Sequence, residues 1–120
     1  MTKVLVVDDS PTETYQLVSL LEKKGFSVIS AESGEEGVLA ARQHQPDVIL
    51  MDVVMPGLNG FQATRQVAKG NDTSHIPVIM VTTKDQETDR VWGMRQGAKA
   101  YLTKPVAEKQ LLSTISAVLA

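Results

Sequence analysis

Acidic side chains stand where two apolar runs of this sequence end. Asp52 comes directly after the apolar run 48–51 and opens a loop rich in proline and glycine. Asp8 and Asp9 follow the apolar run 4–7 in the same way. If these runs are parallel strands, the three carboxylates meet at the carboxyl edge of one sheet, which is where open α/β sheets build their sites.

Two further strand-like runs end in groups that bind phosphate. Thr82 follows the run 78–81, and Lys104-Pro105 follows the run 99–103. Phosphoryl transfer needs donors around the phosphoryl oxygens and a positioned nucleophile, so the set predicts a phosphorylation site with Asp52 as the nucleophile and with Thr82 and Lys104 as donors. The bond between Lys104 and Pro105 is a candidate cis peptide, although only about 5–6% of X-Pro bonds are cis.

Three carboxylates this close together resist full ionisation unless a cation offsets their charge. A site with only oxygen ligands and few protein groups suits Mg²⁺, which keeps several waters and is shared with phosphate. Asp8, Asp9 and Asp52 are therefore candidate ligands of a Mg²⁺ ion that would also hold the phosphoryl oxygens.

The spacing of apolar residues and helix signals predicts an α/β fold. We expect strands over 3–7, 26–31, 47–51, 76–81 and 99–103, and helices from Ser10 to about Lys24, from Ser33 to about His44, and over 60–69, 86–96 and 107–119. Strands that alternate with helices predict a doubly wound parallel sheet of five strands and five helices, with right-handed crossovers.

Ser10 and Glu13 have the spacing of a capping box, in which each side chain bonds to the backbone N–H of the other residue. Pro11 at the first helical position and Gly25 after the last turn support the same helix. We expect Glu13, like Glu22, to lie on a solvated face of this helix.

Composition limits the classes of function. The chain has 120 residues with 42% hydrophobic and 22% charged side chains, so we expect one globular domain over residues 1–120. The net charge of −2 does not favour nucleic-acid binding. There is no cysteine for disulfides or thiolate chemistry, and no apolar run approaches the roughly 20 residues of a membrane span. The first strand starts almost at Met1, so we expect no signal peptide and a cytoplasmic location.

Taken together, these residues resemble the bacterial response-regulator receiver domains of the CheY-like class. The resemblance covers the whole chain and rests on the order and spacing of Asp8-Asp9, Asp52, Met55-Pro56, Gly60, Thr82, Tyr101 and Lys104-Pro105. It implies a flavodoxin-like fold and phosphoryl transfer to Asp52 from the phosphohistidine of a CheA-like histidine kinase or of its phosphotransfer domain. It also implies Mg²⁺ bound by Asp9, Asp52 and the Val54 carbonyl, with Asp8 assisting through water.

The resemblance further implies a conformational switch. The Thr82 hydroxyl moves to the phosphoryl group and the Tyr101 ring turns inward, which changes the surface of the fourth helix, fifth strand and fifth helix. A protein target would bind this surface in a phosphorylation-dependent way, and we expect the chain to be a monomer. Trp92, the only tryptophan, is expected to be half exposed on the fourth helix, where it either anchors a partner or packs locally.

Segments 8–13, 55–65 and 81–89 resemble the stand-alone receivers of a chemotaxis-like pathway that controls type IV pili and twitching motility. Two positions depart from chemotaxis receivers. Val54 stands where a polar residue often positions the attacking water, and Thr83 is larger than the usual alanine or glycine. We expect both to slow loss of the phosphoryl group.

Three other functions compete with this one. A phosphate sink would drain phosphoryl groups from a shared kinase through Asp52 and would need no target; phosphotransfer kinetics and a pull-down with a phosphoryl mimic separate it from a binding module. A phosphohydrolase with an aspartate nucleophile usually needs a second aspartate two residues later, where this chain has Val54. A flavodoxin would need a phosphate loop rich in Ser, Thr and Gly after the first strand, and none is present.

Overall fold

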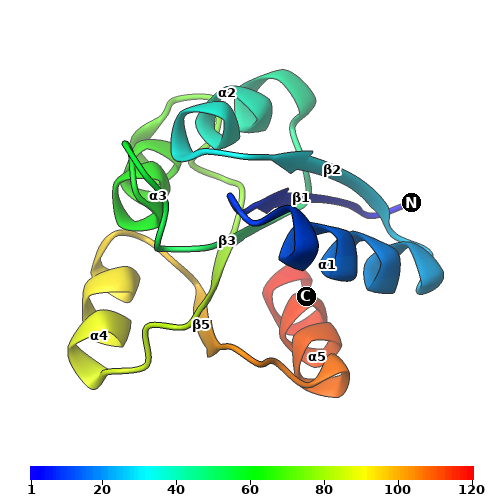
Figure 1. Cartoon of the computed structure of the whole chain (residues 1–120). Helices are drawn as coiled ribbons and strands as arrows, with labels where there is room; N and C mark the ends of the chain where they lie inside the picture. Colours follow the sequence, from blue (N-terminus) through cyan, green and yellow to red (C-terminus); the bar gives the residue numbers. More distant parts are fainter.

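The computed structural model describes all 120 residues and places five strands and five helices in strict alternation (Figure 1). The strands are β1 (Lys3–Val7), β2 (Ser27–Ala31), β3 (Val48–Met51), β4 (Val78–Thr82) and β5 (Ala100–Thr103). The helices are α1 (Pro11–Lys23), α2 (Gly34–His44), α3 (Gly60–Lys69), α4 (Glu87–Arg95) and α5 (Glu108–Leu119). All strands pair in parallel in the order β2-β1-β3-β4-β5, which confirms the predicted doubly wound sheet.

Helices cover both faces of the sheet, because alternate residues of each strand point to opposite faces. Leu5 and Val7 of β1 belong to the core under α2 and α3, whereas Val4 and Val6 belong to the core under α1 and α5. The two helical layers lie on opposite sides of the sheet in Figure 1. The central strand β3 is buried along its whole length, as its uninterrupted apolar sequence predicts.

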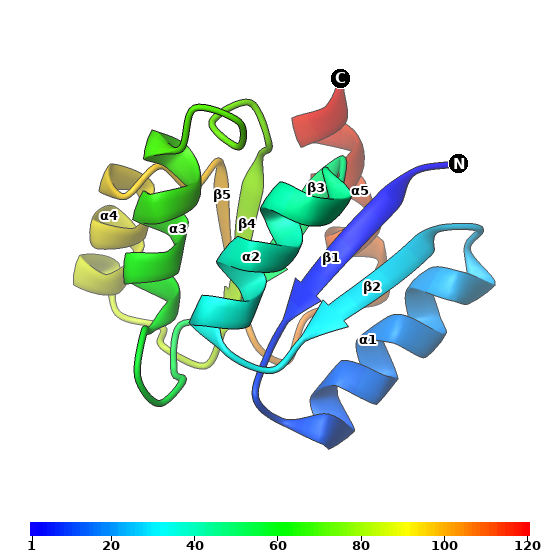
Figure 2. The same cartoon turned by 90° about the horizontal axis from the view of Figure 1, so that it is seen from above.

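The carboxyl ends of all five strands lie at the same edge of the sheet, since every strand pair is parallel (Figure 2). From β1 the chain continues to β2 on one side, and from β3 it continues to β4 on the other side. The order of the strands therefore reverses between β1 and β3, and a crevice forms beyond such a point. Asp8 and Asp52 are the first residues after these two strands.

α4 is the helix that is least integrated into the core. Gly93 is its only buried residue, and a Cβ atom there would lie 2.7 Å from Met80 Sδ and 3.0 Å from the Tyr101 ring. The backbone of the helix therefore rests directly on β4 and β5. Trp92 is 51% exposed, which confirms the expectation of half exposure, and Val91 and Met94 are exposed beside it. None of the five helices has the length and apolar character needed to cross a bilayer.

β1 and α3 match their predicted ranges, and the other predicted elements differ from the structure by one or two residues at their ends. β4, for example, starts at Val78 instead of Ile76; Pro77, just before it, has no N–H for a strand ladder. The capping box predicted at the start of α1 is half wrong. The Ser10 hydroxyl accepts the Glu13 N–H, but the Ser10 N–H donates to Asp8 Oδ1 at 2.9 Å, so the Glu13 carboxylate is free for another partner.

Candidate functional site

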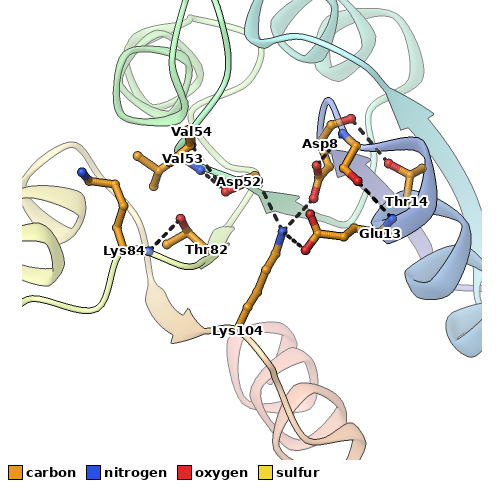
Figure 3. Close-up of polar contacts among 10 residues, drawn as sticks. Asp8, Glu13, Thr14, Asp52, Val53, Val54, Thr82, Lys84 and Lys104 are labelled. Atoms are coloured by element: carbon orange, nitrogen blue, oxygen red, sulfur yellow. Dashed lines mark hydrogen bonds and ion pairs between the residues drawn. The ribbon is translucent and has the colours of Figure 1, made fainter.

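Lys104 reaches from the end of β5 into a group of three carboxylates (Figure 3). Its Nζ atom lies 2.9 Å from Asp8 Oδ2, 2.9 Å from Glu13 Oε1 and 3.3 Å from Asp52 Oδ2. The side chains of Lys104, Asp8 and Asp52 are 12%, 2% and 9% exposed, whereas that of Glu13 is 42% exposed. The bond between Lys104 and Pro105 is cis, as the sequence suggested. Segments from both ends and the middle of the chain thus meet around one ammonium group.

The ammonium group of Lys104 is a permanent charge in this site. Burial by itself lowers the pKa of Lys104, but the hydrogen bonds to Asp8 and Glu13 and the charges of Asp52 and Asp8 raise it above its ordinary value. The lysine therefore stays protonated throughout the physiological range and balances part of the negative charge around it.

Asp52 is held by the backbone on one side and faces the lysine on the other. Its N–H donates to the Val7 carbonyl at 3.0 Å, which ties the residue to the end of β1. Its Oδ1 atom accepts the Val53 N–H at 2.7 Å and lies 3.4 Å from the Val54 nitrogen. Oδ2, the atom nearer to Lys104, is left without a backbone donor. This arrangement fixes the carboxylate and presents one oxygen to the crevice.

The third carboxylate of the group is Glu13, a residue that sequence reasoning placed on a solvated face. The oxygens of Asp8, Glu13 and Asp52 that lie within 4.8 Å of one another form the only such acidic group in the chain. Asp9 is exposed and does not belong to it. The placement of Glu13 on a purely solvated face was therefore wrong, because the carboxylate turns toward the buried ammonium. The one signal for this role of Glu13 was Lys104, because a lysine buried in the site needs several anionic partners.

Thr82 and Tyr101 are linked through the backbone of Lys84. Thr82 is fully buried at the end of β4, and its hydroxyl accepts the Lys84 N–H at 3.3 Å. The Tyr101 hydroxyl donates to the Lys84 carbonyl at 2.8 Å, with the ring buried beneath α4. Val54, two residues after Asp52, has an exposed side chain, and Thr83 is exposed as well.

The phenol of Tyr101 is expected to ionise only at strongly alkaline pH. Burial, followed by the charges of Asp89, Asp52 and Asp85, raises its pKa from 10.0 to about 12. Because the fold favours the neutral phenol, its contribution to stability is complete below about pH 10 and is lost as the pH rises through about 12. In a Tyr15→Phe variant Tyr101 is the only tyrosine, and its tyrosinate absorbance should show a midpoint near pH 12. A midpoint near pH 10 would contradict the buried, hydrogen-bonded phenol.

The loop that carries Asp52 is fastened to the start of α3 at Gly60. The Gly60 N–H donates to the Val53 carbonyl at 2.9 Å, and a Cβ atom at Gly60 would overlap the Asp52 carbonyl oxygen and lie 2.7 Å from Val53 Cα. We expect Gly60→Ala to lower the free energy of unfolding by about 3 kcal/mol, because backbone atoms must shift to make room. Gln66→Ala, on an exposed position of the same helix, should change it by less than about 0.5 kcal/mol in denaturant titrations. Equal effects of the two substitutions would contradict the close approach.

Comparison with known proteins decides the family of this chain. Residues 4–116 match the family described as the response regulator receiver domain. The chain belongs to this family. Among curated proteins, the receiver domain is 68% identical over 120 residues to the protein PilH of Pseudomonas aeruginosa, covering 100% of this chain and 99% of PilH. It is also 37% identical to the transcriptional regulatory protein PhoP of Bacillus subtilis, over 98% of this chain but only 48% of PhoP.

Solved structures of other receiver domains have the same fold. The chemotaxis protein CheY4 of Vibrio cholerae superposes with a TM-score of 0.93 at 34% identity, covering 99% of both chains. The receiver domain of the sensor histidine kinase PA1611 of Pseudomonas aeruginosa superposes with a TM-score of 0.91 at 27% identity, covering 98% of this chain and 97% of the other. The latter structure holds a magnesium ion in its active-site cleft.

The residues of this receiver domain fit a magnesium ion. The group that faces the crevice offers only oxygen ligands from three carboxylates, and one ammonium leaves it with a net charge of −2. Mg²⁺ prefers carboxylate oxygens and retains several waters, which a crevice at the surface of the molecule can accommodate. A divalent cation and Lys104 would therefore share or exchange the same carboxylates.

Proposed function

We propose that residues 1–120 form one phosphoacceptor domain, in which Asp52 accepts a phosphoryl group from a histidine kinase. The observation that supports this proposal most strongly is the buried Lys104 ammonium, 3.3 Å from Asp52 Oδ2 at the point where the strand order of the sheet reverses. Receiver domains as a family take phosphoryl groups from histidine kinases. In this chain the donor would be a CheA-like kinase or its phosphotransfer domain.

The step that we propose is a direct displacement at phosphorus. A carboxylate oxygen of Asp52 forms a bond to phosphorus while the bond from phosphorus to the imidazole nitrogen of the phosphohistidine breaks. The bonding electrons leave with that nitrogen, and the imidazole, already protonated on its other nitrogen, departs as a neutral group. The product is an acyl phosphate on Asp52. Lys104 stabilises the charge on the phosphoryl oxygens, and backbone anchoring of Asp52 Oδ1 keeps the nucleophile in place.

Asp9, Asp52 and the Val54 carbonyl, assisted by Asp8 through water, would hold Mg²⁺, as the resemblance implies. When bound, the ion supplies positive charge that offsets the crowded carboxylates and the phosphoryl oxygens. Asp9 is exposed and its carboxylate forms no hydrogen bond or ion pair with another protein group, which is compatible with this role.

The switch that we propose runs from Thr82 to the surface of α4. If the Thr82 hydroxyl turns toward a phosphoryl group on Asp52, it releases the Lys84 N–H that it now accepts. The Lys84 carbonyl accepts the hydrogen bond of the Tyr101 hydroxyl. A movement of Lys84 would therefore also shift the Tyr101 phenol and the helix α4 that packs on it. Such a local event can bias an equilibrium between two conformations that differ by a few kcal/mol.

The output of this switch would be phosphorylation-dependent binding of a protein target to the surface of α4, β5 and α5. Exposed Val91, Trp92 and Met94 on α4 support an interaction at this surface. We further propose that the chain works as a monomer in the cytoplasm, within the chemotaxis-like pathway that controls type IV pili and twitching motility. The identity of 68% to PilH and the motif segments described above support this assignment.

The proposed function is tested by phosphorylation with a small donor. The purified chain is incubated with Mg²⁺ and acetyl phosphate, and its intact mass is measured before and after treatment with hydroxylamine, which cleaves acyl phosphates. We expect one added phosphoryl group that hydroxylamine removes. A chain that gains no mass, or a label that resists hydroxylamine, would overturn the proposal. Continuous release of phosphate from unrelated phosphate esters would favour the phosphohydrolase instead.

A further inference from the structure

Glu13 occupies a place in the site that the proposed function does not require. Its carboxylate lies 2.9 Å from Lys104 Nζ, closer than that of Asp52 at 3.3 Å. We propose that Glu13 is a positioning residue that holds the Lys104 ammonium toward α1 and thereby slows phosphoryl uptake on Asp52. The proposal rests on the proposed function, because it concerns the rate of that reaction.

The number of donors on Lys104 is the first argument. An ammonium group has three N–H donors and no acceptor. In this structure Asp8, Glu13 and Asp52 are its three acceptors. A phosphoryl oxygen can therefore be bound by Lys104 only after one of the three carboxylates gives up its place. The rate and extent of phosphorylation then depend on which carboxylate leaves and how strongly it is held.

The degree of burial identifies Glu13 as the carboxylate that gives up its contact with Lys104. Asp8 is 2% exposed, so breaking its pair would leave a buried carboxylate without a partner. Asp52 is the group that receives the phosphoryl group. Glu13 is 42% exposed, so water can take over its carboxylate when the lysine moves away. The pair between Glu13 and Lys104 is thus the exchangeable part of the network.

The positions of Asp8 and Glu13 around the Lys104 ammonium are the second argument. Asp8 and Glu13 both belong to the segment that leads from β1 into α1, and in Figure 3 both lie on the opposite side of Lys104 Nζ from Asp52. Each of them lies 2.9 Å from the ammonium. Removing Glu13 leaves Asp8 as the only anchor on that side, so the ammonium is freer to approach the phosphoryl group on Asp52.

The test compares rates of phosphoryl uptake from acetyl phosphate in the presence of Mg²⁺. We expect Glu13→Gln to react about two- to fivefold faster than the wild type, the size set by a half-exposed ion pair. Glu22→Gln removes the same charge from the exposed far end of the same helix and should leave the rate unchanged. Glu13→Asp keeps the charge but is one methylene shorter and cannot reach Lys104 equally well, so it should also react faster.

A second measurement follows the lysine itself. In ¹⁵N-labelled protein the ammonium resonance of Lys104 should shift in Glu13→Gln and stay in place in Glu22→Gln. Equal uptake rates in the wild type and Glu13→Gln would overturn the proposal, and so would an acceleration that Glu13→Asp does not share, since the effect would then come from net charge alone. If the wild type itself takes up no phosphoryl group, the proposed function fails. If it does so at the same rate as Glu13→Gln, only the role of Glu13 fails.

Discussion

Asp52→Ala is expected to take up no phosphoryl group under conditions that add one to the wild type. The substitution removes the carboxylate whose Oδ1 is anchored by the backbone of its own loop and whose Oδ2 lies 3.3 Å from Lys104 Nζ. Asp8 should not replace it, because its side chain is only 2% exposed, against 9% for Asp52, and its Oδ2 is held by Lys104 at 2.9 Å, a shorter distance than the 3.3 Å to Asp52 Oδ2. Intact mass after incubation with acetyl phosphate and Mg²⁺ gives the result directly.

The Asp52→Ala variant should remain folded, so a loss of phosphoryl uptake can be assigned to the missing carboxylate. Lys104 keeps two carboxylate partners, Asp8 and Glu13, so no buried charge is left alone. Asp72→Ala removes a carboxylate at an exposed turn and should take up the group as the wild type does. If Asp52→Ala gained the same mass as the wild type, the nucleophile would have to be another residue, and the proposed mechanism would be wrong.

Lys104→Ala is expected to lower the stability of the fold strongly. Without the ammonium, Asp8 and Asp52 remain as two nearly buried carboxylates with no cation between them. Breaking a buried ion pair by removing one partner costs about 3–5 kcal/mol. We expect Lys104→Ala to lower the free energy of unfolding by about 3 kcal/mol, at the low end of this range, because the third partner, Glu13, is partly solvated. Denaturant titrations at neutral pH without divalent cations measure this difference.

Lys24→Ala is the matched control. Lys24 pairs with Glu108 at 3.2 Å, but both side chains are about half exposed, and pairs of this kind contribute less than about 1 kcal/mol. Added Mg²⁺ should stabilise Lys104→Ala more than the wild type, because the ion no longer competes with an ammonium for the same carboxylates. Equal losses in the two lysine variants, or equal responses to Mg²⁺, would show that Lys104 does not neutralise this site.

The fold was predictable because local and long-range signals agree in this chain. Runs such as 4–7 and 48–51 are apolar throughout, which suits strands covered on both faces, and polar residues follow them at the sheet edge. Parallel strands then bring Asp8, Asp52 and Lys104 together without any further information. Convergence of these side chains is a consequence of topology, and topology follows from the alternation of strands and helices.

The sequence did not show the role of Glu13, and it did not distinguish the orientations of Asp8 and Asp9, for two separate physical reasons. The capping-box spacing of Ser10 and Glu13 is a local signal, but the carboxylate found a stronger partner in Lys104, which lies near the other end of the chain. Asp8 and Asp9 are consecutive, and consecutive residues at a strand end point in different directions. Asp8 turned into the crevice and Asp9 toward solvent. Neither choice can be read from composition or spacing.

The small buried surface of α4 affects how the binding specificity of such a chain can change during evolution. Since Gly93 alone is buried, almost every other side chain of this helix can be exchanged without disturbing the hydrophobic interior. A new binding specificity can therefore arise by replacing exposed residues such as Trp92, while the proposed phosphorylation site at the carboxyl ends of the strands is left untouched. The fold separates the part that has to stay constant from the part that is free to evolve.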